Sequence, residues 1–113
     1  MIYEDLLTVP FKEFGRTMDG LDCYGLCIEL CKRAGKTLND ITDKKIETIR
    51  KINVLVIQKK DIEAGDLVHY EHEDGELHIG YLLDKTNVIH MTKKGVRITP
   101  LIYFSNVEYL RVV

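Results

Sequence analysis

The sequence predicts an α+β fold, with helices in the first half of the chain and antiparallel strands in the second. Apolar residues between positions 23 and 34 recur at helical spacing. From position 64 onward, short segments rich in β-branched and aromatic residues alternate with turn-forming residues. Because the helices precede an uninterrupted series of strands, we expect them to pack on one face of a five- to six-stranded antiparallel sheet.

The first helix is expected over residues 23–34. Asp22 precedes this segment and can cap its N-terminus, and Gly35 suits the position just after its end. Before the helix, residues 2–8 are predicted as a short helix or an irregular segment. Residues 10–19 are predicted as a loop.

A second helix is expected to begin after a cap at Asn39 or Asp40. Its buried face would carry three isoleucines: Ile46, Ile49 and Ile52. Residues 54–57, Val-Leu-Val-Ile, fit either a continuation of this helix or the start of a strand, because short apolar runs do not discriminate between the two.

The remainder of the chain is predicted to form a meander of antiparallel strands. The turns between strands contain glycine or aspartate, residues that favour tight reversals of the chain. The expected strands are residues 67–70, 76–83, 87–91, 96–101 and 107–113.

Length and composition restrict the classes of protein. The chain has 113 residues, which is enough for one domain over residues 1–113 with its own apolar core. Its net charge of -2 gives no reason to expect binding to nucleic acid. The apolar runs are too short for a membrane span, and the first ten residues lack the features of a secretion signal, so the chain is expected to be cytoplasmic as synthesised.

Three cysteines, Cys23, Cys27 and Cys31, recur every four residues along the first helix. Residues of one regular helix are poorly placed for a disulfide, so free thiols are expected. Cys23 occupies the first helical turn, where unpaired backbone N–H groups and the helix dipole favour the reactive thiolate. We therefore predict that Cys23 is a nucleophile and that Cys27 and Cys31 fill the core.

Two histidines in adjacent predicted strands complete a candidate Cys-His site. Alternation places His78 on the same face as Gly80, whose missing side chain would let the helix N-terminus approach the imidazole of a general base. His90 shares this face if the loop between the strands has an odd number of residues. In that case His90 can hydrogen-bond His78 and fix its tautomer, as the third residue of a triad does.

Other polar residues have simpler interpretations. His69 and His72 have a spacing found in zinc sites, but without a third ligand they are expected to be exposed histidines at a strand end, and no metal or cofactor is predicted. The lysine pairs at positions 44–45 and 59–60 are expected on solvated faces.

Four ordered segments carry the motifs of a known family. Residues 22–26, Asp-Cys-Tyr-Gly-Leu, are similar to its Asp-Cys-Ser-Gly-Leu motif, and residues 65–68 to its Gly-Asp-Leu/Val motif. Residues 78–83 are similar to its His-Val-Gly-Ile-Tyr-Leu strand, and residues 89–90 to its Ile-His pair. The chain thus resembles the NlpC-type cysteine peptidases, compact papain-like enzymes that act on bacterial cell-wall peptides. Residues 95–98 resemble the phage tail-assembly branch of that family.

The resemblance implies a papain-like fold with Cys23 as nucleophile, His78 as base and His90 as the orienting residue. It further implies hydrolysis of the bond between D-γ-glutamate and a diamino acid in peptidoglycan stem peptides. Asp22 and Tyr24, which flank the nucleophile, are the expected substrate-binding residues, with Tyr24 lining one wall of the groove. Phage tail proteins are further possible partners, and a phage particle could deliver the chain to the cell wall.

Two departures from the family motifs keep alternatives open. Tyr24 stands where the family usually has a small serine, and Phe11 stands where it usually has a tyrosine. A non-catalytic component of a phage tail would retain the same fold. An amidase, deamidase or acyltransferase would use the same Cys-His site, because this geometry serves any acyl transfer.

Overall fold

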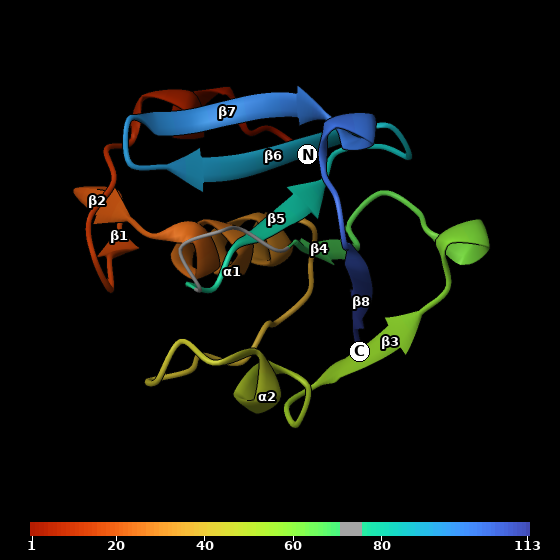
Figure 1. Cartoon of the computed structure of the whole chain (residues 1–113). Coiled ribbons are helices and arrows are strands. Elements are labelled where there is room, and N and C mark those ends of the chain that lie inside the picture. Colours follow the sequence, from red (N-terminus) through yellow and green to blue (C-terminus); the bar gives the residue numbers. More distant parts are fainter. Residues whose placement is uncertain (71–75) are drawn as a thin grey trace.

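A six-stranded antiparallel sheet with a helix packed against it dominates the part of the chain that the structure describes (Figure 1). The computed structural model describes residues 1–70 and 76–113 and confirms the predicted α+β class. The strands lie in the order β3 (Val54–Ile57), β8 (Glu108–Val112), β4 (Leu67–His69), β5 (Ile79–Leu82), β6 (Asn87–Thr92) and β7 (Gly95–Pro100).

The predicted meander is confirmed for β4 to β7 and is wrong for the last strand. β8 returns to lie between β3 and β4, pairing with both. Residues 54–57 are therefore a strand and not a helical continuation, because their backbone pairs with β8 from Val54 opposite Val112 to Ile57 opposite Tyr109.

The turn between β5 and β6 determines which residues share a face of the sheet. Leu82 pairs with Val88, and the N–H of Leu83 donates to the carbonyl of Asn87 at 3.0 Å. The pairing leaves residues 84–86 as a loop of odd length, as the site hypothesis requires. The carboxylate of Asp84 stabilises this loop by accepting the N–H groups of Thr86 and Asn87.

Helix α1 (Cys23–Arg33) confirms the predicted first helix. Asp22 caps it, since its carboxylate accepts the N–H of Gly25 at 2.7 Å. Gly35 follows the C-terminus with φ of +81°, a left-handed conformation that glycine adopts without strain. The buried face of α1 includes Cys27 and Cys31, both free thiols, as predicted.

The predicted second helix is wrong for most of its length, because α2 covers only Ile46–Ile49. Asp40 does not cap a helix: its carboxylate binds Arg16 at 3.0 Å and the N–H of Ile41 at 2.7 Å. Lys44 then has φ of +53°, which interrupts any helix through this segment. Of the three isoleucines, Ile49 is fully buried.

Short elements occupy the segments predicted as irregular. The lead-in contains a 3₁₀ turn, η1 (Glu4–Thr8), and the predicted loop contains a small hairpin, β1 (Arg16–Thr17) and β2 (Gly20–Leu21), beside the start of α1 (Figure 1). Two further 3₁₀ turns are η2 (Lys59–Asp61) and η3 (Leu101–Tyr103).

Two separate apolar clusters involve alternate residues of the strands. One contains the buried face of α1 together with strand residues such as Leu67 and Ile79. The other contains Val68 of β4 and Leu82 of β5, which lie on the opposite face of these strands, and the aromatic ring of Tyr70. Among the described residues, no helix has the length and apolar character needed to cross a membrane.

Candidate active site

Cys23 and His78, the predicted nucleophile and base, line the same cavity, which has a volume of about 400 Å³. Cys23 comes from the first turn of α1, and His78 directly precedes β5. Phe11, Lys44 and Tyr70 also line this cavity, and they come from three other parts of the chain. The fold thus brings together side chains that lie more than 50 positions apart in sequence.

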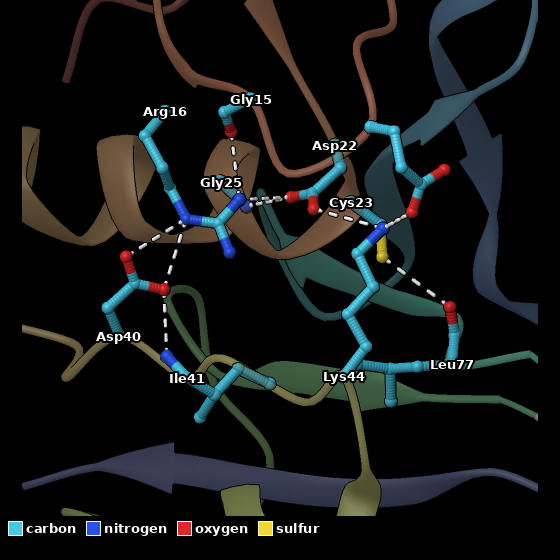
Figure 2. Close-up of polar contacts among 10 residues, drawn as sticks. Gly15, Arg16, Asp22, Cys23, Gly25, Asp40, Ile41, Lys44 and Leu77 are labelled. Atoms are coloured by element: carbon cyan, nitrogen blue, oxygen red, sulfur yellow. Dashed lines mark hydrogen bonds and ion pairs between the residues drawn. The ribbon is translucent and has the colours of Figure 1, made fainter.

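The sulfur of Cys23 lies against the backbone that carries His78. Its Sγ donates to the carbonyl oxygen of Leu77 at 3.5 Å (Figure 2). The side chain is half-buried where α1 meets the start of β5. This contact places Sγ beside the carbonyl group that immediately precedes His78.

Electrostatics around Cys23 oppose its ionisation. Burial raises the pKa of the Cys23 thiol to about 11, and the adjacent carboxylate of Asp22 adds to the increase. The N–H of Ile79, the ammonium of Lys44 and the N–H of Tyr24 act in the opposite direction. The prediction that the helix N-terminus produces a thiolate is therefore wrong for this structure, because desolvation outweighs the helix dipole.

Asp22 is a fully buried carboxylate with cations on two sides (Figure 2). Its Oδ1 accepts Nη1 of Arg16 at 2.6 Å as well as the capping N–H of Gly25. Its Oδ2 forms no hydrogen bond among the described residues and lies 3.2 Å from Nζ of Lys44. Asp22 therefore fixes the start of α1, and its expected role in substrate binding stays a prediction.

Lys44 is a site residue that sequence reasoning missed. Besides Asp22, its ammonium contacts the carboxylate of Glu13 and lies 4.6 Å from the ring centroid of Phe14. Although burial lowers the pKa of Lys44, its contacts with the carboxylates of Glu13 and Asp22 raise it overall. The expectation that Lys44 lies on a solvated face is wrong, because its partners come from a distant segment that no local pattern reveals.

Gly80 and His90 face each other across β5 and β6. His78 lies two positions before Gly80, and its carbonyl accepts the N–H of Tyr70 at 3.1 Å, which extends the pairing of β4 and β5. Because alternate residues of a strand share a face and Gly80 pairs with His90, residues His78, Gly80 and His90 lie on the same face of the sheet, as predicted. A Cβ at position 80 would lie 2.5 Å from Cγ1 of Val88 and 3.3 Å from Cβ of His90. Gly80 thus makes room for β6, and the expectation that it makes room for α1 is wrong.

Two hydroxyl groups hold the imidazole of His90. Nδ1 lies 3.4 Å from the hydroxyl of Tyr70, and Nε2 lies 2.8 Å from Oγ1 of Thr99. The ring of Phe104 contacts it edge-on, with centroids 5.2 Å apart. Burial lowers the pKa of His90, with smaller contributions from Arg97 and His78, so the ring is neutral at neutral pH. The predicted hydrogen bond from His90 to His78 stays a prediction.

Tyr24 does not line the groove, and that expectation is wrong. Its side chain is fully buried, and its hydroxyl donates to the carbonyl of Asn39 at 2.5 Å. The ring belongs to the apolar core, and the guanidinium of Arg16 lies over it at 5.8 Å from the ring centroid. Phe11 does line the cavity, so an apolar ring stands where the resemblance implies a phenol.

The remaining predicted residues lie outside the site. His69 is half-buried at the end of β4, while His72 lies outside the described residues. In residues 1–70 and 76–113, no three His, Cys, Asp or Glu side chains are grouped to hold a metal ion. Lys59 and Lys60 are exposed, as predicted.

Comparisons with known proteins bear on the family and on the fold. The model of the NlpC/P60 family matches residues 8–109. Among solved structures, the fold is similar to the NlpC/p60 domain of the peptidoglycan hydrolase SagA, with a TM-score of 0.68 and 17% sequence identity. The similarity covers 98% of this chain and 92% of that domain. No curated protein matches the chain.

Proposed function

The chain belongs to the NlpC/P60 family, and we propose that it is a cysteine peptidase that hydrolyses peptides of peptidoglycan. The observation that carries this proposal is the shared cavity of Cys23 and His78, with the cysteine in the first turn of a capped helix. A nucleophile and a base in one cavity are the minimum that acyl transfer requires. His90 is proposed as the third residue, since it shares the face of Gly80 and holds a fixed orientation.

In the proposed mechanism, the thiol proton of Cys23 passes to the imidazole of His78 as the sulfur attacks the peptide carbonyl. Proton transfer must accompany attack, because the pKa of the Cys23 thiol lies near 11. The backbone N–H of Cys23 would stabilise the oxyanion. The C–N bond then breaks, and His78 returns the proton to the leaving amine. Water attacks the thioester with His78 as base, which releases a carboxylic acid and restores the thiol.

The charges of the cavity suit a peptide that carries both carboxylates and amino groups. Lys44 and Lys93 line it together with Glu13 and Glu76. A stem peptide with a D-γ-glutamyl–diamino acid bond has groups of both signs near the bond to be cut. We therefore propose this bond as the substrate. The peptidoglycan hydrolase SagA, whose domain has a similar fold, supports the substrate class.

Product analysis tests the proposal. Purified peptidoglycan is digested with the chain, and soluble fragments are identified by mass spectrometry, with Cys23→Ala as the blank. We expect fragments that end at D-γ-glutamate and others that begin at the diamino acid. Fragments released at a different amide would assign the site to an amidase or acyltransferase, and an absence of fragments above the blank would contradict the proposal.

A second candidate function is a non-catalytic member of the family. The burial that raises the pKa of Cys23 favours it, because a protonated thiol is a weak nucleophile. Association with a phage tail, and delivery by a phage particle to the cell wall, are proposals that rest on the sequence of residues 95–98 alone. The same digestion separates the two functions, since a non-catalytic chain releases no fragments.

A further inference from the structure

We propose that Tyr70 is a positioning residue that connects His90 to His78, an inference that rests on the proposed function. The ring of Tyr70 lies against the imidazole of His78, with centroids 5.5 Å apart and planes inclined by 30°. Its hydroxyl lies 3.4 Å from Nδ1 of His90. One side chain therefore contacts both histidines, through its face and through its polar end.

Several contacts hold Tyr70 in this orientation. It directly follows β4, and its backbone N–H donates to the carbonyl of His78, which fixes the two residues relative to each other. Its ring also packs against Phe104, with centroids 4.6 Å apart. Only 8% of the residue is exposed, and it lines the cavity that contains Cys23. A ring enclosed in this way limits the rotation of the imidazole that it covers.

The two hydrogen-bond partners of the His90 imidazole explain why its effect on His78 would pass through Tyr70. A neutral imidazole has one donor and one acceptor nitrogen. Thr99 lies at hydrogen-bond distance from Nε2, and Tyr70 lies on the Nδ1 side. If Nε2–H donates to Thr99, then Nδ1 accepts the Tyr70 hydroxyl, and in the other tautomer both bonds reverse. In either arrangement Thr99 and Tyr70 together hold the imidazole of His90 in one orientation.

Among the described residues, two titratable groups act on the charge of His90. Arg97 lies opposite it on β7, and His78 precedes β5; both lower the pKa of His90. Tyr70, Thr99 and Phe104 supply the neutral contacts described above. Removal of the Tyr70 hydroxyl therefore changes a hydrogen bond without removing any of these charges.

The test is Tyr70→Phe, which keeps the ring and deletes the hydroxyl. We expect kcat for stem-peptide cleavage to fall about tenfold with KM unchanged, because the base is less well oriented while the cavity keeps its shape. The matched control is Tyr109→Phe. Tyr109 lies in the same apolar cluster as Tyr70 but on β8, so its variant measures the loss of a tyrosine hydroxyl without the link to His90. Equal kcat in Tyr70→Phe and Tyr109→Phe overturns the proposal.

A second measurement needs no substrate and so separates this proposal from the function proposed above. The ¹⁵N signals of the two imidazoles are recorded for the whole chain. We expect the signals of both His78 and His90 to move in Tyr70→Phe and to remain in place in Tyr109→Phe. If only the His90 signals move in Tyr70→Phe, or if the signals of neither histidine move, the proposed connection between His90 and His78 through Tyr70 is overturned. If the native chain cleaves no stem peptide, the proposed function fails while this measurement still decides the role of Tyr70.

Discussion

Burial raises the pKa of Cys23 most, and the charges around one buried carboxylate adjust it further. Asp22 caps α1 and at the same time places a negative charge beside the thiol. Arg16 and Lys44 balance that charge from two sides. A buried carboxylate is stable only with such partners. The reactivity of the nucleophile and the stability of the helix start therefore depend on the same three side chains.

Asp22→Asn should make Cys23 more reactive. Asparagine still caps a helix, but the variant removes the negative charge that raises the pKa of the thiol. A lower pKa gives more thiolate at a fixed pH below it, so we expect alkylation by iodoacetamide at pH 8 to be about 3- to 10-fold faster. Asp40→Asn is the control, because this carboxylate also binds Arg16 but is exposed. An unchanged rate in Asp22→Asn would show that Asp22 does not control the thiol.

Lys44→Met should act in the opposite direction. The ammonium of Lys44 lowers the pKa of Cys23 and neutralises Oδ2 of Asp22, so its removal leaves the carboxylate charge less balanced. We expect alkylation of Cys23 at pH 8 to be about 3- to 10-fold slower. Lys45→Met removes an adjacent, exposed charge and should leave the rate unchanged. Equal decreases in the alkylation rate for Lys44→Met and Lys45→Met would mean that the rate depends on the net charge of the chain and not on the position of Lys44.

Some residues of the candidate site could be predicted from their neighbours in sequence, and others could not. Cys23 and its cap Asp22 are adjacent, and helix capping depends on neighbours in the chain. Lys44 and Tyr70 join the site through contacts with residues far away in sequence, so nothing in their own neighbourhoods distinguishes them from a surface lysine and a core tyrosine. Desolvation of Cys23 likewise follows from packing and not from helix position.

At the scale of elements, the start of α1 is held by close packing against the β1–β2 hairpin. A Cβ at Gly25 would lie 2.2 Å from the carbonyl oxygen of Gly15, so no side chain fits at this position. This contact brings the loop that contains Phe11 to the edge of the cavity. Helix α1 was predictable because periodicity, cap and terminal glycine agree. The second helix was not, since a long-range ion pair withdraws Asp40 from capping.

Gly25→Ala should therefore destabilise the fold strongly. The new methyl group collides with backbone, which cannot move aside as a side chain can, and we expect a loss of about 2–4 kcal/mol in the free energy of unfolding in urea. Gly35→Ala serves as the comparison. A Cβ there meets nothing within 4 Å, so only its positive φ is costly, by about 1 kcal/mol. Equal losses in the two variants would contradict the packing argument.

At the scale of the whole molecule, the sheet separates the helix from the contacts that hold His90. Within each strand alternate residues face α1, while Tyr70, Leu82 and Val88 belong to the second apolar cluster. The candidate site lies where the N-terminus of α1 reaches the start of β5. The five strands of the second half of the chain were predictable from alternation and turn residues, whereas the odd length of the loop between β5 and β6 was a condition that the pairing of the two strands fulfils. The return of β8 between β3 and β4 was not predictable, because strand order depends on pairings between distant segments.

The central claim is that Cys23 performs acyl transfer on peptidoglycan peptides. Its most direct test compares stem-peptide cleavage by the native chain, by Cys23→Ala and by Cys31→Ala. Cys31 is a buried thiol of the same helix and lies outside the site, so its variant controls for loss of a cysteine. We predict that Cys23→Ala remains folded by circular dichroism and releases no product, while Cys31→Ala retains turnover. Cleavage by Cys23→Ala at the native rate would contradict the account.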